Sequence, residues 1–301
     1  MDYKKFLEEI EEAVRRKAGT QVKVAVSRAL KTNRNYIDQI SLLADGMNIS
    51  PAIPLDVYYE QYRCGKSIDF LAESIWSLYE KSDQKGSADV SFYSDFEKVK
   101  LQIACKLINY NKNEELLRHV PHRRFHDLAI VYYCRTEHTV LGKGSILIQS
   151  DHLKQWDTDA DHIHEAAFFN TMRILPYRIY DIADILEESF GRPRREKDTR
   201  HAQMYVLTNS EKYWGAVSII YGGVLEKIAE KIGKDYFVLP SSIHECMIVP
   251  EADALKKEEL HQMVREINRS CVAQEDILGD SIYHYSMEKR ELELVYGAEE
   301  A

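Results

Sequence analysis

The spacing of hydrophobic residues in the first eighty positions predicts a small lobe of helices and strands. Four apolar residues recur at helical spacing and would form one stripe: Phe6, Ile10, Ala13 and Val14. The chain is therefore expected to open with an amphipathic helix. Two strand-like runs, 22–26 and 37–43, flank a turn-prone segment at 32–35 and predict a hairpin. The elements expected next are an edge strand within 46–54 and helices from about Leu55 and Ser67.

A helix-start signal follows at Ser94. Ser94 and Glu97 stand three residues apart, as in a capping box, where each side chain accepts a hydrogen bond from the other residue's backbone N–H. Apolar residues continue at helical spacing behind them: Phe96, Val99, Ile103 and Leu107. The pattern predicts a helix that runs from Ser94 to about Leu107.

The rest of the chain alternates short apolar runs with amphipathic stretches. The runs 128–134 and 145–148 predict a central hairpin, because two glycines lie between them. A capped helix is expected to open at Thr158 with Asp161 in its first turn. Strands are expected at 204–207, 216–221, 236–239 and 243–249, and a final hairpin around 287–290. Helices are expected before Gly191, up to Ile232 and over 260–271.

These elements predict an α+β protein of two lobes, with largely antiparallel sheets flanked by amphipathic helices. Hairpins outnumber the strand–helix–strand units that would require parallel pairing, although the last third leaves an α/β alternative open. The polar run 81–89 has the composition of a linker. It predicts an N-terminal lobe over 1–84 and a larger domain over 91–301.

Composition points to a cytoplasmic protein. No apolar run approaches the roughly 18 residues that span a bilayer, and residues 1–16 alternate charged and apolar side chains, unlike a signal peptide. The five cysteines form no Cys-x-x-Cys pair, so they are expected to be reduced thiols.

The net charge of −9 argues against a nucleic-acid partner, because binding to phosphates requires a cationic surface. One local exception is the arginine-rich segment 192–200, where Arg194 and Arg195 are candidate binding residues. The simpler interpretation of this segment is a solvated loop.

Three motifs resemble metal or cofactor sites, but each is incomplete. The sequence therefore predicts neither a bound metal nor a cofactor. His122 and His126 have the spacing of a metal pair on a helix, yet arginines follow the first histidine where a zinc protease has glutamate; a short helix opened by Pro121 is the simpler interpretation. The acidic run 157–161 imitates a calcium loop without its glycine or its last glutamate. Gly222 and Gly223 lack the remaining residues of a phosphate-binding loop.

The segment 239–245 (LPSSIHE) is the best candidate site, because it places two hydroxyls, an imidazole and a carboxylate at a break between two apolar strands. Ser242, His244 and Glu245 are the candidate catalytic residues, as nucleophile, general acid or base, and orienting carboxylate. Asn209 and Ser241 are candidate binding residues. A turn whose polar side chains bond to the local backbone would explain the same residues.

Several segments resemble an uncharacterised family of domain-of-unknown-function proteins from anaerobic Gram-positive bacteria. They are 48–51, HRRFHDLAIVYYC at 122–134, 144–148, 206–209, 215–216, YFVLPSSIHE at 236–245 and 250–251. The resemblance covers most of the chain. It implies a bacterial cytoplasmic protein, one associated with mobile elements, and it carries over neither an activity nor catalytic residues.

The absence of a complete catalytic motif favours a non-catalytic binding or regulatory protein, with an unknown protein or small molecule as its partner. Its site would be a surface groove beside tyrosine-rich strands such as those of Tyr132, Tyr133 and Tyr221. The alternative is a hydrolase that uses Ser242, His244 and Glu245, with Asn209 as an electrophilic helper. A second alternative is a nucleic-acid or defence-related factor of mobile elements that acts through segment 192–200.

Overall fold

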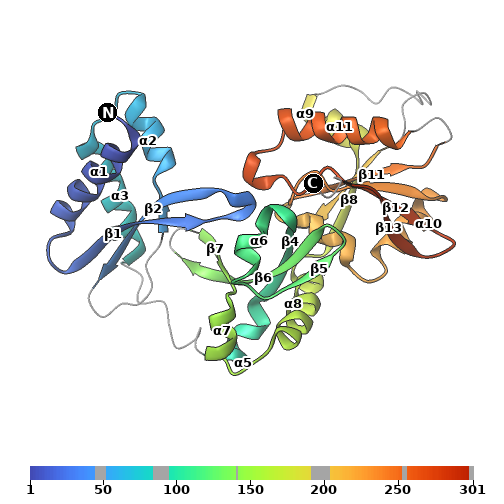
Figure 1. Ribbon diagram of the computed structural model, residues 1–301, viewed down its shortest axis with the longest axis horizontal. Coiled ribbons are helices and arrows are strands. Elements are labelled where there is room, and N and C mark those ends of the chain that lie inside the picture. Colours follow the sequence, from blue (N-terminus) through green and yellow to red (C-terminus); the bar gives the residue numbers. More distant parts are fainter. Residues whose placement is uncertain (45–51, 84–94, 140–141, 191–203, 253–255, 298–301) are drawn as a thin grey trace. The chain divides into compact units, whose positions relative to one another are not determined.

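The computed structural model describes residues 1–44, 52–83, 95–139, 142–190, 204–252 and 256–297, and Figure 1 shows its ribbon. The chain divides into two compact units. The first contains residues 1–99 and 135–146, and the second contains residues 100–134 and 147–301. The boundary predicted between residues 84 and 91 lies outside the described residues and stays a prediction.

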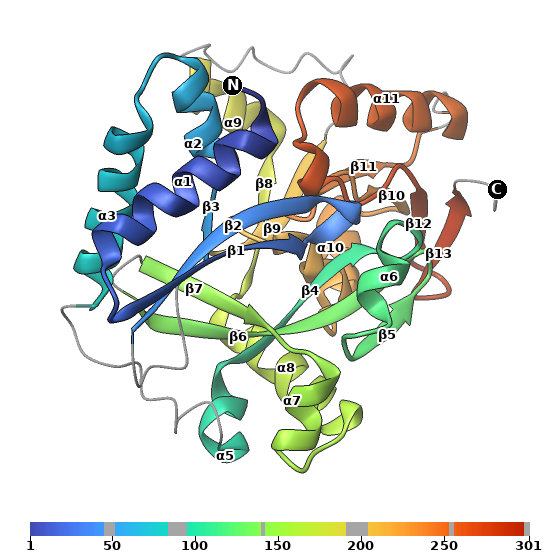
Figure 2. The ribbon, with the colours of Figure 1, turned by 60° about the vertical axis from the view of Figure 1, so that its left-hand side comes forward.

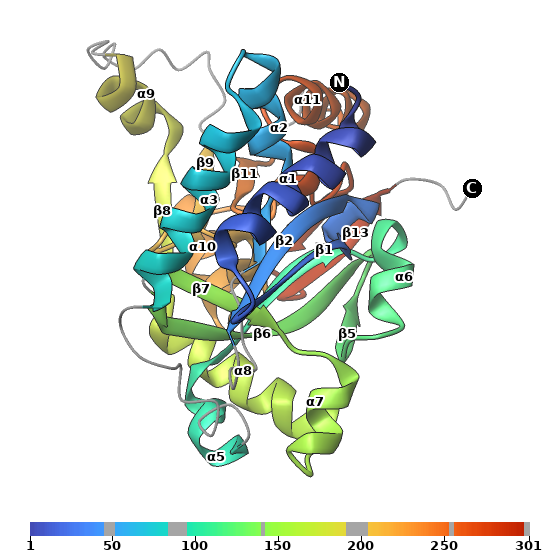
Figure 3. The same ribbon diagram turned by 90° about the vertical axis from the view of Figure 1, so that its left-hand side faces the viewer.

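The first unit is built on a three-stranded antiparallel sheet in the order β1-β2-β3. Its elements are α1 (Tyr3–Ala18), β1 (Val22–Leu30), β2 (Tyr36–Ala44), β3 (Ala52–Pro54), α2 (Asp56–Arg63), α3 (Ile68–Asp83) and α5 (Phe96–Val99). Helices α1 and α3 lie on one face of the sheet (Figures 2 and 3). The predicted opening helix, the hairpin and the two helices after it are confirmed.

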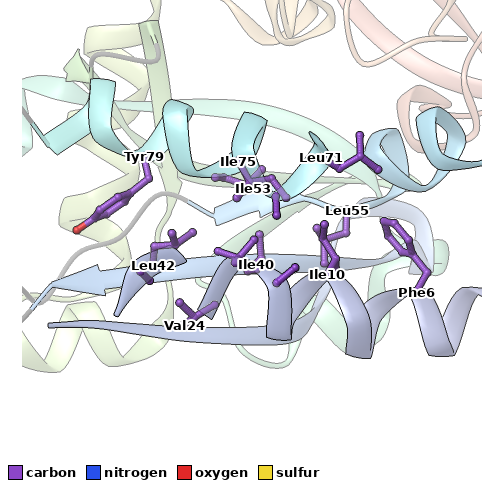
Figure 4. Packing of buried hydrophobic residues seen from close by; sticks show 14 residues of the cluster. Phe6, Ile10, Val24, Ile40, Leu42, Ile53, Leu55, Leu71, Ile75 and Tyr79 are labelled. Atoms are coloured by element: carbon purple, nitrogen blue, oxygen red, sulfur yellow. The ribbon is translucent and has the colours of Figure 1, made fainter. Parts of the chain in front are cut away.

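The core of the first unit forms where the apolar stripe of α1 meets α3 and the sheet (Figure 4). Phe6 and Ile10 are fully buried there together with Ile40 of β2 and Ile75 of α3. Burying one such side chain stabilises the fold by about 1.5–3 kcal/mol. Asp2 fixes the start of α1, because its side chain accepts a hydrogen bond of 2.9 Å from the backbone N–H of Lys5.

The second unit contributes most of two further sheets. The first has the strand order β4-β6-β5, with β7 paired to β6. The second has six strands in the order β13-β12-β10-β11-β9-β8, and each neighbouring pair in it is antiparallel. This topology confirms the α+β class, and the strands described in the last third of the chain pair only in antiparallel fashion.

The strands of these sheets are β4 (Ile103–Asn109), β5 (His122–Phe125), β6 (Leu128–Thr139), β7 (Gly142–Leu147), β8 (Tyr177–Asp181), β9 (Tyr205–Asn209), β10 (Tyr236–Leu239), β11 (Cys246–Pro250), β12 (Ile282–Ser286) and β13 (Glu291–Tyr296). The α-helices are α6 (Glu114–Leu117), α7 (Ser150–Gln155), α8 (Ala160–Ile174), α9 (Ile182–Phe190), α10 (Val224–Ile232) and α11 (Lys257–Ser270). Short 3₁₀ helices are η1 (Thr32–Arg34), η2 (Lys100–Gln102), η3 (Asn111–Asn113), η4 (Gly215–Ile220) and η5 (Gln274–Asp276). Most strands and helices expected from the hydrophobic pattern are confirmed.

Two helices anchor these sheets. Helix α8 packs on β4 (Figure 2). Thr171 Oγ1 of this helix accepts a hydrogen bond of 2.9 Å from the Cys105 backbone N–H. Helix α11 packs on the six-stranded sheet through Leu260 and Val264, which join a buried cluster with Phe237. Among the described residues no helix combines the length and apolar character needed to cross a membrane.

The helix predicted from Ser94 to Leu107 is wrong. Helix α5 ends at Val99, η2 follows, and Ile103 begins strand β4, which pairs with β6 over its whole length. The positions between the predicted helical stripe are also apolar, and Ala104, Cys105 and Ile108 are as buried as Ile103. A strand buried on both faces explains this continuous pattern better than a helix with one apolar face.

Two other expectations are wrong. The segment 216–221 forms the 3₁₀ helix η4 instead of a strand, because Gly215 packs against the main chains of β9 and His244 and turns the chain. The segment after Pro121 forms strand β5 instead of a short helix, with His122 opposite Val131 of β6. The cap of α8 lies one residue later than expected, at Asp159.

Candidate functional site

The predicted site segment 239–245 connects β10 to β11 and is held by its backbone. Ser241 accepts a hydrogen bond from the Leu278 N–H, and the Ile243 N–H donates to Asp276, at 2.9 and 2.8 Å. Ser242 forms an isolated β-bridge with Ile277. Both serines are buried, whereas Glu245 is exposed. The segment is thus a connection between two strands whose backbone is hydrogen-bonded to residues 276–278.

The structure does not join the Ser242 hydroxyl to the imidazole of His244. Ser242 Oγ accepts a hydrogen bond of 3.1 Å from the backbone N–H of His244. The ring nitrogen Nδ1 accepts one of 3.2 Å from the Trp214 N–H, and Nε2 lies 3.4 Å from Asp276 Oδ1. The carboxylate beside this histidine is therefore Asp276, which sequence reasoning missed because no local motif connects the two residues.

Both the oxygen and the nitrogen of the Asn209 side-chain amide form hydrogen bonds to the backbone of the turn that follows. Its Oδ1 accepts hydrogen bonds from the backbone N–H groups of Glu211 and Tyr213, and its Nδ2 donates to the Tyr213 carbonyl at 2.8 Å. Trp214, which follows, has a left-handed backbone with φ of 53°. Asn209 therefore fixes the path of the chain between β9 and η4.

The remaining predicted residues lie apart from one another. Arg194 and Arg195 fall outside the described residues, so the arginine-rich segment stays a prediction. His122 lies on strand β5 and His126 in the turn after it, so the two do not share a helix face. In the acidic run, Asp159 caps α8 by accepting hydrogen bonds from the backbone N–H groups of Asp161 and His162.

A groove of about 460 Å³ in the second unit offers a better candidate site. Its size falls in the range of small-molecule pockets, about 300–1,000 Å³. Its lining residues are 123–125, Ile130, His164, Phe168, 219–223, Leu225, Glu226, Tyr285, Arg290 and Leu292. They come from β5, β6, α8, the connection from η4 into α10, and the β12–β13 hairpin. Sequence reasoning had noticed Tyr221, Gly222 and Gly223 among them, without the groove.

Much of the groove wall is apolar. Phe125, Phe168 and Leu225 line it. Ile219 and Tyr221 also line it, and both are almost completely buried. Such a wall gains free energy by covering an apolar or aromatic body, at about 25 cal/mol for each Å² removed from water.

Three arginines line the same groove, and they differ in how they are held. Arg123 forms an ion pair of 2.7 Å with Asp161. Arg124 donates from Nε to the His126 carbonyl at 2.9 Å. For Arg290, no hydrogen bond or ion pair of the guanidinium is found within the part of the chain that the structure describes.

Arg290 also adopts a left-handed backbone, with φ of 55° in the turn between β12 and β13. This conformation costs about 1–2 kcal/mol for a residue with a side chain and usually favours glycine or asparagine. A long cation held at this cost beside a groove is the kind of strained position that clusters at functional sites.

His164 supplies a neutral polar group. Burial, and then the positive charge of Arg123, lower its pKa, so the imidazole is uncharged at neutral pH. Its Nδ1 lies 3.0 Å from the hydroxyl of Tyr132, whose pKa is raised by burial and which therefore remains a donor. When this hydroxyl donates to Nδ1, the ring proton sits on Nε2, where it can be donated to a ligand.

Part of the groove wall consists of the backbone of Gly222 and Gly223, which have no side chains. Gly223 has a left-handed φ of 74°, and a Cβ added at Gly222 or Gly223 would meet no heavy atom within 4 Å. The space beside these glycines is therefore open, and a ligand can approach the backbone closely.

The fold is that of an α+β protein, and its second unit carries a partly apolar groove lined by three arginines and one glutamate. The chain belongs to the family of unknown function designated DUF5688, which it matches over residues 3–287. The match confirms the whole-chain resemblance to a family without an assigned activity. Comparisons with curated proteins and with solved structures find no match.

Proposed function

We propose that the protein is a non-catalytic binding protein whose groove takes a small anionic ligand with an apolar or aromatic body. The observation that carries this proposal is the guanidinium of Arg290, which has no hydrogen-bond or ion-pair partner among the described residues and lies beside an apolar wall. A charge-assisted hydrogen bond from Arg290 to a carboxylate or phosphate would orient the ligand, while the aromatic rings cover its body.

The charges around the groove support an anion over a cation. Arg123, Arg124 and Arg290 outnumber the one acidic lining residue, Glu226. Because the whole chain has a net charge of −9, this excess of positive charge is local. That overall charge also disfavours a long nucleic acid as the ligand.

We also propose that the protein is located in the cytoplasm of a bacterium. None of the five cysteines forms a disulfide, and three of them, Cys105, Cys134 and Cys246, are buried thiols. Buried thiols without a disulfide are typical of a reducing compartment.

The first test uses 8-anilinonaphthalene-1-sulfonate, whose fused rings and sulfonate match the two halves of the groove. Its fluorescence is titrated with the wild-type protein, with Arg290→Gln and with Arg265→Gln, which removes an exposed arginine of α11 far from the lining residues in sequence. We expect Arg290→Gln to weaken binding about tenfold, the equivalent of about 1.4 kcal/mol. Arg265→Gln should bind as the wild type does.

A second variant tests the sign of the charge effect. Glu226→Gln removes the acidic lining residue and should tighten binding of the same sulfonate. Equal affinities for Arg290→Gln and Arg265→Gln would contradict the proposal, as would weaker binding by Glu226→Gln. A thermal-shift screen of carboxylates and phosphate esters, run on the wild type and Arg290→Gln, would then identify the class of natural ligand.

A further inference from the structure

Three potential metal ligands meet at one end of the six-stranded sheet, in a place that the groove does not use. Asp235 immediately precedes β10, Glu251 immediately follows β11, and His284 lies within β12. Antiparallel pairing brings them together, because Tyr236 faces Pro250 and Phe237 faces His284. One ligand atom from each side chain lies within 4.8 Å of the other two.

We propose that Asp235, Glu251 and His284 bind a divalent transition-metal ion such as Zn²⁺. His284 Nε2 and Glu251 Oε2 are 3.2 Å apart. Two ligands of a tetrahedral zinc ion are separated by about 3.3–3.5 Å when each lies about 2.0–2.2 Å from the metal. This pair thus has nearly the spacing of two ligands on one ion, and a carboxylate oxygen of Asp235 lies within 4.8 Å of both.

The charge balance of the cluster favours a cation. Within the part of the chain that the structure describes, no lysine or arginine forms an ion pair with Asp235 or Glu251. Glu293, directly across from His284 on β13, is neutralised separately by Lys289 at 2.9 Å. The two carboxylate ligands carry a formal charge of −2 when ionised, which a divalent ion balances.

Neighbouring groups contact two of the three side chains and fix the backbone of the third. Asp235 Oδ1 accepts a hydrogen bond of 3.0 Å from the Met287 N–H, and the backbone N–H of Glu251 donates to the Asp235 carbonyl at 2.9 Å. The ring of Phe237 lies 5.1 Å from that of His284. Contacts of this kind orient metal ligands before the ion arrives.

The ligand types indicate which ion fits. One imidazole nitrogen with carboxylate oxygens suits zinc, manganese, iron or cobalt, and the absence of a thiolate disfavours soft Cu(I). Glu251 is exposed, so water has access to the remaining coordination positions. Three protein ligands with an open position are typical of zinc sites that bind water or substrate. The ligands lie far apart in the sequence, which is why motif spacing predicted no metal.

The same residues would also form a simple His–Glu ion pair between strands, so the test must separate the two cases. The full chain is freed of metal with a chelator and titrated with Co²⁺, whose visible absorption reports coordination by protein ligands. Zn²⁺ binding is measured in parallel by calorimetry. We expect one ion per chain, and at least a tenfold weaker affinity for His284→Gln, Glu251→Gln and Asp235→Asn.

His261→Gln is the matched control. His261 also faces a carboxylate of the same unit, with Nε2 3.5 Å from Asp280 Oδ2, and among the described residues no third metal-ligand group joins this pair. This variant should bind metal as the wild type does, and circular dichroism should show all variants folded. A wild-type chain that binds no Co²⁺ or Zn²⁺, or a folded His284→Gln that binds them equally well, would overturn the proposal and leave the ion pair.

Discussion

Tyr283 donates a hydrogen bond from its phenol to the carboxylate of Asp127, so that β12 is tied to the turn between β5 and β6. Ser281 donates to the other oxygen of the same carboxylate. Residues from two different sheets are thereby connected through one carboxylate. The tyrosine itself is completely buried, whereas Asp127 is partly exposed.

Replacing Tyr283 with phenylalanine should destabilise the second unit by about 1–3 kcal/mol, because Asp127 would lose a donor while it stays partly buried. The free energy of unfolding in urea measures the effect. Tyr285→Phe is the control: Tyr285 is a buried tyrosine of the same strand, and no hydrogen bond of its hydroxyl is found among the described residues. If the two variants lose equal stability, the Tyr283–Asp127 hydrogen bond contributes nothing of its own.

The protein should lose stability as the pH rises above about 9. Burial raises the pKa of the Cys105 thiol to about 11 and that of Cys134 to about 12, from an ordinary value near 9. Each folded-state pKa is raised, so the stabilisation is fully present below the unfolded pKa and is lost as the pH rises through the folded pKa. Urea unfolding at pH 8, 9, 10 and 11 should show a progressive decrease.

A thiol reagent provides the independent check on these cysteines. Cys64 and Cys271 are exposed and should react quickly in the native protein, whereas Cys105, Cys134 and Cys246 should react only after unfolding. Constant stability between pH 8 and 11, or rapid native labelling of all five thiols, would show that the buried cysteines do not have this environment.

Gly215→Ala should be among the most destabilising single substitutions in the second unit. A Cβ at this position would lie 2.6 Å from both the Asn209 nitrogen and the His244 carbonyl oxygen. Overpacking against backbone costs about 1–3 kcal/mol or more, because the main chain must move. Gly222→Ala is the matched control, since its Cβ would meet no atom within 4 Å. Scanning calorimetry should show a clearly lower Tm for the first variant alone.

The periodicity of hydrophobic residues was sufficient to predict the helices and strands that have one buried face and one exposed face. The stripe of Phe6 and Ile10 determined α1, and the turn between two strand-like runs determined the β1–β2 hairpin. It failed at β4, because a strand buried on both sides has apolar residues at helical spacing as well as at strand spacing. It also failed at Gly215, where a close approach of three chain segments decides the local conformation.

The sequence by itself determined the α+β class, the antiparallel sheets and the membership of a family without a known activity. The tertiary structure decided which polar and charged side chains lie close together. It paired His244 with Asp276 instead of Ser242, gathered the groove around Arg290, and brought Asp235 to His284. The physical reason is that periodicity records which side chains face the core, whereas a site depends on distances between segments that only strand pairing and packing set.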